Sequence, residues 1–256
     1  MMKVKTQNEI EIMREGGKRL SHILQQVALR VVPGVRDSEL DKLARELIEQ
    51  GGDKPAFLHY KPDFASKPFS ATLCVSLNDE VVHGIPNGRV LKDGDIVGLD
   101  LGLEHGGLFT DMAVTVAVGN VSEGNSRLMQ ITKSALEAGI TVVKEDAYVG
   151  DIGKSIENLV RPAGFSIVEE LGGHGVGRAI HESPFIPHFA GKKGERLLAG
   201  QTIAIEPMIN TGGKDVIFDT VDGYTVRTAD GSNSAHYEVT IAVTSKGALI
   251  LTPIFW

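Results

Sequence analysis

The sequence predicts an α+β domain in which two related halves pack around a central antiparallel sheet. The first observation behind this prediction is a repeated segment. Residues Gly94–Asp100 and Gly200–Glu206 each begin with glycine, continue through mostly apolar residues and end with an acid six positions later. The second observation is that another acid, Asp111 in the first half and Glu238 in the second, begins a further apolar strand. Each half therefore carries two acids on strands that otherwise suit a buried sheet.

The first half begins with two predicted helices. Apolar residues recur at helical spacing over 10–27 and again over 40–48. Asp37 or Ser38 is expected to cap the second of these helices, because a short polar side chain can accept a hydrogen bond from the first turn.

The second half repeats this order. Ser122 is expected to open a helix whose apolar residues continue to Ile140, and a shorter helix follows around residues 152–160. Helix, helix and strands thus occur twice, which indicates pseudo-twofold symmetry. We expect one catalytic domain over residues 1–256, with repeat halves of about 1–121 and 122–256 that do not fold separately.

The acids of the first half lie on a predicted β-hairpin. If its glycine-rich turn centres on His105 and Gly106, Asp100 lies directly opposite Asp111. Two carboxylates about 5 Å apart on an apolar sheet repel each other unless one is protonated or a cation lies between them. A divalent metal site is one interpretation, and solvated acids at strand ends are the other. The second acid pair favours the metal site.

Composition excludes several classes of function. The 256 residues are 42% hydrophobic, enough for a substantial core, and the net charge of −7 argues against general binding of nucleic acids or anionic membranes. The single Cys74 excludes an internal disulfide and is typical of a reducing compartment. The sequence contains no run of about 18 apolar residues and no apolar signal segment at its start, so we expect a cytoplasmic protein without a membrane span.

Histidines and an aromatic loop accompany the acids. His174 lies among four glycines, His181 follows seven residues later, and His83 ends an apolar stretch. Residues 53–71 contain prolines and aromatics, which favours a loop that frames a pocket. Four carboxylates with one imidazole form an oxygen-rich donor set that suits Mn, Fe, Co or a pair of hydrolytic Zn ions.

Several short motifs recur in a characteristic order along nearly the whole chain. They are Asn78–Pro86, the acids Asp100 and Asp111, Gly173–Gly177, His181–Glu182, Ile205–Met208 and Tyr237–Glu238. Together they resemble the type I methionine aminopeptidases of the pita-bread fold, in the compact bacterial form.

The resemblance implies a pair of divalent metal ions, each Co, Mn, Fe or Zn. Asp100 would chelate one ion, Asp111 and Glu238 would bridge both, and His174 with Glu206 would complete the second. A hydroxide that bridges the metals would attack the scissile carbonyl, as dinuclear hydrolases do.

The resemblance also implies the catalytic residues. His181 would contact the scissile peptide and stabilise the tetrahedral intermediate. His83 would lie near the substrate amine or the leaving nitrogen, and Glu206 would shuttle a proton from the attacking water.

By the same resemblance, the substrate is the N-terminus of a peptide or nascent chain near the ribosome, and the enzyme is a monomer. It would remove methionine before a small second residue. The residues expected to form or neighbour the methionine pocket are Phe57, Tyr60, Phe64, Cys74, Ile180 and Tyr224.

The chain departs from the family pattern mainly around this pocket. Ile180 stands where Phe is usual, Tyr224 where Trp is usual and Phe57 where Cys is common. Val239 replaces a usual His, and His236 stands where Gln is usual. Compensating changes in packing would explain the pocket departures, and an altered side-chain preference is the alternative.

Two alternatives remain. A proline-directed aminopeptidase or dipeptidase of the same fold would share the five metal ligands, although such enzymes usually carry a large N-terminal domain. A non-catalytic binding module on this scaffold would lack the ligands, and all five are present here.

Overall fold

The computed structural model describes residues 4–63 and 65–256. Its helices are α1 (Gln7–Ala28), α2 (Asp37–Gln50), α3 (Glu123–Thr141) and α4 (Val149–Val160), with a short 3₁₀ helix over Arg161–Ala163. Two helices therefore precede the main strands of each half, and the predicted α+β order is confirmed.

Of the two helix N-caps predicted from the sequence, one is confirmed and the other is wrong. Ser122 caps α3, and its hydroxyl accepts a hydrogen bond from the Asn125 N–H at 3.1 Å. The predicted cap of α2 was wrong, because the N-cap residue is Arg36 and makes no side-chain cap. The Asp37 carboxylate instead accepts hydrogen bonds from the Gly88 N–H and from Arg89, so it ties the helix to a distant loop.

Three antiparallel sheets form the β structure of the described residues. The largest has nine strands, in the order β1-β4-β5-β14-β9-β7-β8, with β2 also paired to β4 and β15 to β14. Two three-stranded sheets have the orders β13-β10-β6 and β11-β12-β3. The strands are β1 (Lys54–Pro55), β2 (Leu73–Leu77), β3 (Glu80–Val82), β4 (Ile96–His105), β5 (Leu108–Ala117), β6 (Ser166–Ile167), β7 (Gly173–Gly175), β8 (Glu182–Ile186), β9 (Thr202–Ile205), β10 (Met208–Asn210), β11 (Val216–Phe218), β12 (Val226–Thr228), β13 (Ser234–His236), β14 (Glu238–Thr244) and β15 (Gly247–Ile250).

The order of the central strands is symmetric about the β5–β14 pair. The repeated segments form β4 and β5 in the first half and β9 and β14 in the second, which gives the order β4-β5-β14-β9. The second strand of each repeat thus meets its counterpart at the centre of the sheet. This is the pseudo-twofold arrangement that the repeated acids predict.

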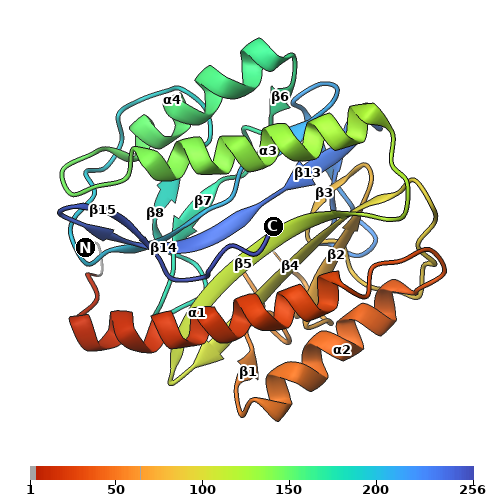
Figure 1. Cartoon of the computed structure of the whole chain (residues 1–256), viewed down its shortest axis with the longest axis horizontal. Coiled ribbons are helices and arrows are strands. Elements are labelled where there is room, and N and C mark those ends of the chain that lie inside the picture. The colour runs from red at the N-terminus through yellow and green to blue at the C-terminus, as the bar shows by residue number, and fades with distance from the viewer. Residues whose placement is uncertain (1–3, 64) are drawn as a thin grey trace.

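The four helices cover one face of the large sheet (Figure 1). Helix α1 crosses β4 and β5, α3 lies over the second half, and the C-terminal segment runs between them. Alternate residues of β4, such as Leu99 and Leu101, face this helical layer and are fully buried. The residues between them, including Asp100, face the opposite side, where the site lies.

The first hairpin differs from its predicted register. Its turn is Gly106–Gly107, both with positive φ (57° and 80°), and His105 pairs with Leu108. A two-residue turn of this kind needs positive φ at both central positions, which favours two glycines over His105 and Gly106. Asp100 consequently pairs with Ala113, so the prediction that it lies directly opposite Asp111 was wrong. The two acids are diagonal neighbours on one face of the sheet.

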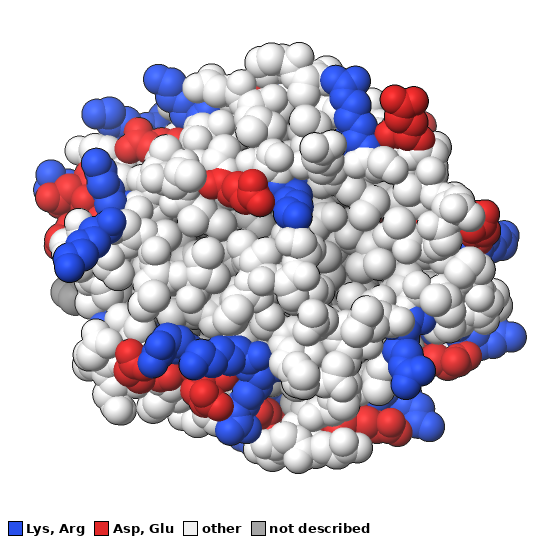
Figure 2. Space-filling model, viewed as in Figure 1, with Lys and Arg blue, Asp and Glu red and all other residues white. Residues whose placement is uncertain are grey.

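Charged side chains of both signs are mixed on the surface seen in Figure 2. On the described part of the face seen in Figure 2, acidic and basic side chains are interspersed around the edge and no extended basic patch appears. Within residues 4–63 and 65–256, no helix combines the length and the apolar character needed to cross a bilayer.

Candidate metal centre

The sheet register places the predicted acids in a row across neighbouring strands. Cys74 pairs with Asp100, Asp100 with Ala113, and Ala113 with Glu238. Glu206 directly follows β9, where the next position in register with β14 is Glu238. The small side chain of Ala113 leaves room between acids that come from the two halves of the chain.

A second row lies two residues further along the same face. Asp111 in β5 is joined to Thr240 in β14, whose hydroxyl donates to the Asp111 carbonyl at 2.8 Å and accepts from its N–H at 2.9 Å. Thr240 pairs with Ala204 in β9, and β7 continues the row with His174. His174 in turn pairs with Phe185 in β8, the edge strand.

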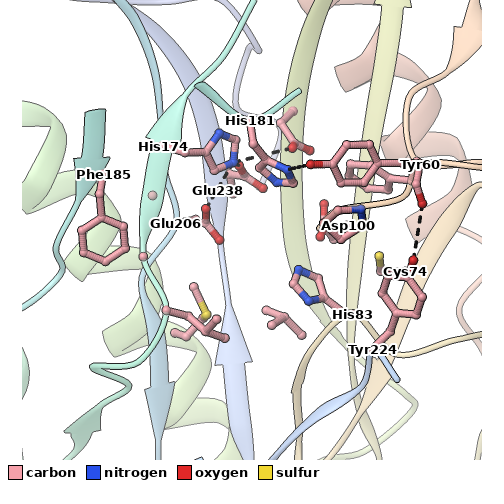
Figure 3. Close-up of a pocket in the computed structure, with 18 of the residues that line it drawn as sticks. Tyr60, Cys74, His83, Asp100, His174, His181, Phe185, Glu206, Tyr224 and Glu238 are labelled. Carbon is pink, nitrogen blue, oxygen red and sulfur yellow. Dashed lines mark hydrogen bonds and ion pairs between the residues drawn. The ribbon is translucent and has the colours of Figure 1, made fainter. Parts of the chain in front are cut away.

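The five predicted ligands converge on one point (Figure 3). The His174 Nε2 atom lies 3.4 Å from Glu206 Oε1 and 4.0 Å from both Asp111 Oδ2 and Glu238 Oε1. The ligand atoms of His174, Glu206 and Glu238 lie within 4.8 Å of one another, as do those of Asp100, Asp111 and Glu238. Glu238 belongs to both of these groups, the position expected of a residue shared by two metal ions, and a third group joins Asp111 and His174 with His181.

Burial sets the protonation of these side chains. Desolvation raises the pKa of Asp111 to about 7. Desolvation and then the neighbouring carboxylates raise the pKa values of Asp100 and Glu238 well above their usual range. Desolvation lowers the pKa of His174 to about 3, so its imidazole is neutral at neutral pH and can act as a ligand. Four ionised carboxylates are therefore unfavourable here without cations.

The unsatisfied atoms show that the residues fit divalent metal ions. Among the described residues, the buried atoms Asp100 Oδ1 and Glu238 Oε1 have no hydrogen-bond partner. Buried carboxylate oxygens without partners are costly, and a hard divalent cation would satisfy them. Four carboxylates and one neutral imidazole are an appropriate donor set for such ions.

His181 lies at the mouth of the same pocket and is held by its neighbours. Its Nδ1 atom is 2.9 Å from the Tyr60 hydroxyl, and its ring centroid is 4.4 Å from that of His174. The next residue, Glu182, forms a buried ion pair with Lys5 at 2.6 Å and accepts hydrogen bonds from the backbone N–H groups of the preceding turn. The turn is therefore rigid although part of the His181 ring is exposed. Desolvation still lowers the pKa of this ring.

His83 occupies the opposite wall in a strained backbone conformation. It follows β3 with φ of 60°, a value that costs a non-glycine residue about 1 kcal/mol or more. The buried Glu80 carboxylate, three residues earlier, pairs with Arg227 at 2.7 Å and with Arg89. This network anchors the strand that ends at His83, and burial lowers the pKa of His83 to about 4.

The pocket has a volume of about 590 Å³ and has two different ends. On one side of the metal centre, four of the predicted pocket residues and Phe69 form an apolar wall. The predicted four are Phe57, Tyr60, Cys74 and Tyr224. The Phe69 and Tyr224 rings meet edge to face at 5.1 Å, and the Tyr224 hydroxyl donates to the Lys67 carbonyl at 2.6 Å.

One predicted pocket residue is placed differently, and one is not described. Ile180 is buried in the apolar cluster behind the wall, with Phe57 and Tyr224, and does not line the pocket itself. Phe64 lies outside the described residues. The prediction of a loop that frames the pocket is supported by Tyr60, Pro62 and Phe69, which all line it.

Two further histidines flank Glu206, and sequence reasoning did not give either of them a role. The Glu206 N–H donates to His188 Nε2 at 3.3 Å, and His236 Nε2 lies 3.5 Å from Glu206 Oε2. His188 is fully buried and His236 nearly so. No local motif marks His188, whereas His236 is visible in the sequence as a departure two residues before Glu238.

A centre of paired acids and one imidazole, set in a pseudo-symmetric antiparallel sheet, defines a metal-dependent peptidase of the pita-bread fold. The model of metallopeptidase family M24 matches residues 11–245 of this chain, and the chain belongs to that family. Members of this family use divalent metal, and the buried acids described above suit that chemistry.

Relatives and solved structures agree on the fold and the family. The chain is 44% identical to a methionine aminopeptidase of Aquifex aeolicus, over 97% of this chain and 98% of the relative. The crystal structure of methionine aminopeptidase from Rickettsia prowazekii matches with a TM-score of 0.95 and 37% identity, over 99% and 100% of the two chains. The prolidase of Pyrococcus furiosus shares the fold with a TM-score of 0.76 at 21% identity, and this chain covers 66% of it.

Proposed function

We propose that this M24 peptidase removes the N-terminal methionine from peptides and nascent proteins whose second residue is small. The observation that carries the proposal is the pocket beside the metal centre. A wall of aromatic side chains and Cys74 faces a cluster of acids and histidines that can hold divalent metal. The names of the relatives, methionine aminopeptidases with coverage of nearly the full chain, support the same reaction.

Two divalent ions of Co, Mn, Fe or Zn would be held by the five converging side chains. Asp100 would serve one ion, His174 and Glu206 the other, and Asp111 and Glu238 both, in keeping with three overlapping candidate groups of which Asp111 and Glu238 each join two. When bound, such ions activate water at neutral pH and polarise a substrate carbonyl.

The remaining roles belong to the histidines and Glu206. If the Tyr60 hydroxyl donates to His181 Nδ1, the ring proton is on Nε2, where a neutral imidazole can donate to the oxygen of the scissile carbonyl. His83, on the far wall, would contact the substrate amine or the leaving nitrogen. Glu206, whose carboxylate lies at the centre, would carry the proton from the attacking water.

The apolar wall would bind the methionine side chain. A thioether is unbranched and polarisable, so it can fill an irregular aromatic pocket. Phe57, Tyr60, Cys74 and Tyr224 would contact it, with Ile180 packed behind them. A large second residue would displace the scissile carbonyl from the crowded metal centre.

The cellular setting is part of the proposal. We expect a cytoplasmic monomer that acts on chains as they leave the ribosome. The single buried Cys74 is typical of a reducing compartment. We also propose one folding unit, because the metal centre draws its ligands from both halves.

The test is to compare kcat/KM for Met-Ala, Leu-Ala, Ala-Pro and Met-Leu peptides with each candidate metal. We expect Met-Ala to be the best substrate, with Met-Leu and Leu-Ala well below it. Preferential cleavage of Ala-Pro would move the assignment to the proline-directed enzymes of this fold. Equal rates on Leu-Ala would show that the pocket does not select methionine.

A further inference from the structure

The turn that carries His181 is closed by the residue that follows it. Glu182 Oε1 accepts hydrogen bonds from the backbone N–H groups of Arg178 at 2.6 Å and Ala179 at 3.0 Å. The Tyr60 hydroxyl contacts the ring of His181 (Figure 3), whereas the backbone position of His181 depends on this turn. Glu182 has no role in the function proposed above.

The other carboxylate oxygen of Glu182 is held by Lys5, which is distant in sequence. Lys5 Nζ lies 2.6 Å from Glu182 Oε2, and the two side chains are only 1% and 6% exposed. Within residues 4–63 and 65–256, Lys5 is the only lysine or arginine that is buried. A buried ion pair is weak evidence for stability, and its best-attested use is to fix one arrangement of the chain.

The chain around Lys5 suits this contact. The Lys5 N–H donates to the Gly200 carbonyl at 2.7 Å, which fixes its backbone. A Cβ atom on Gly177 would lie 2.4 Å from Lys5 Cε and would displace the lysine side chain, so the close approach depends on this glycine. A second, more exposed ion pair joins Arg178 to Glu9 at 2.7 Å. Together the two pairs fasten Lys5 and the first turn of α1 to the turn that carries His181.

We propose that Lys5 is a positioning residue for His181. Its ammonium holds the Glu182 carboxylate against the turn, and the turn sets the position from which the His181 ring meets the scissile carbonyl. The inference rests on the proposed function, which gives His181 that contact. Without the ammonium, an ionised Glu182 is left with a buried, unpaired charge at the edge of the pocket that it lines, and the turn must shift to relieve it.

The test measures kcat, KM and metal content for Lys5→Met, which keeps an unbranched side chain of similar length without the charge. A misplacement of about 1 Å can slow catalysis about 100-fold, so we expect kcat on a Met-Ala peptide to fall by about 10- to 100-fold. KM and metal content should change little. Glu182→Gln keeps an acceptor for the two N–H groups but attracts Lys5 less, and should cause a smaller loss of kcat.

Lys214→Met provides the matched control. Lys214 forms an ion pair of similar length with Glu169, at 2.7 Å, and neither residue lines the pocket. This variant should leave kcat unchanged. An equal loss of kcat in Lys214→Met and Lys5→Met would overturn the proposal, because the effect would then not depend on the turn.

A double-mutant cycle separates positioning from general destabilisation. In a His181→Ala background, Lys5→Met should cause no further loss of kcat, because the side chain that it positions is absent. A merely structural effect would lower kcat by the same factor in both backgrounds and would overturn the proposal, as would an unchanged kcat in Lys5→Met alone. If Lys5→Met does not fold, Glu182→Gln is measured in the same two backgrounds with the same expectation. Failure of the wild-type protein to cleave any Met-Ala peptide would instead contradict the proposed function.

Discussion

The two halves of the molecule deliver equivalent acids with different structural support. In the first half, Asp100 and Asp111 lie within long continuous strands joined by a two-glycine turn. In the second half, Glu206 follows the end of β9 and Glu238 begins β14, with 31 residues between them that form four further strands. The two halves therefore share the position of the acids in the sheet, but they differ in the strands and connections that carry these acids.

The difference in support explains the difference in side chains. A short Asp needs the strand itself to pass close to the centre, and two long strands achieve this. Glu has one more methylene and can reach the centre from the end of a strand. Its longer side chain has more rotamers, so neighbouring side chains must hold its carboxylate in place. His188 and His236 flank Glu206, whereas the first-half acids are held mainly by the sheet, Thr240 and Cys74. We expect the first half to be sensitive to charge and the second half to depend on its flanking side chains.

The largest effect is expected for Asp111→Asn, which would test the first half. The substitution preserves shape and the hydrogen bond from the Met112 N–H, but it removes one negative charge from the two candidate groups that contain Asp111. We expect loss of bound metal and of nearly all peptidase activity in a folded protein. Metal analysis of the purified variant with a kinetic assay is the measurement, and two retained ions with normal turnover would refute the bridging role.

For the metal-free protein, Asp111→Asn is expected to change the pH dependence of stability. The folded-state pKa of Asp111 is about 7, raised from 3.8, so the fold favours its protonated form. In the metal-free wild type, the contribution of Asp111 to the free energy of unfolding is fully present below pH 4 and is lost as the pH rises towards 7. The metal-free variant should therefore exceed the metal-free wild type in stability, and the gap should widen between about pH 4 and pH 7. Urea unfolding at several pH values measures the gap, and a constant gap would contradict the assigned shift.

A smaller effect is expected at His181, which we propose is not a ligand although it forms a candidate group with Asp111 and His174. His181→Ala should lower kcat by about 10²–10⁴-fold because it removes a donor to the reacting carbonyl. Metal content should stay unchanged. Tyr60→Phe, which removes only the partner of His181 Nδ1, should cause a smaller loss of kcat in the same direction. If metal is lost in His181→Ala, this histidine is a ligand.

Much of this centre could be predicted from the sequence because its signals are local. The repeated glycine-to-acid spacing marked both halves, and apolar periodicity marked the helices. The hairpin register was missed because two overlapping turn positions, His105–Gly106 and Gly106–Gly107, differ by one residue. Only the need for positive φ at both positions separates them.

Features that depend on tertiary contacts could not be predicted. His188 approaches Glu206 from 18 residues away along the chain, and no spacing rule links the two. Asp37 looked like a helix cap, but its carboxylate is used by Arg89. Ile180 was expected at the pocket, and whether an apolar residue lines a cavity or lies behind it depends on the packing of its neighbours.

The dependence of the second half on its flanking side chains is tested at His236. The expected loss of metal affinity is the smallest of the effects predicted here. The backbone N–H of this histidine donates to Thr115 Oγ1 at 2.9 Å, and its buried Nε2 atom lies 3.5 Å from Glu206 Oε2 without hydrogen-bond geometry. Burial lowers the pKa of His236 to about 3, and the neutral ring can direct an N–H at the carboxylate and orient it for metal. His236→Leu should weaken metal binding by about 10–100-fold, and His236→Gln, which retains an N–H donor, should restore much of it. Calorimetric titration of the metal-free proteins measures this affinity without reference to turnover. Equal metal affinities for the Leu and Gln variants would mean that the His236 ring only fills space. The two halves would then differ in strand geometry alone.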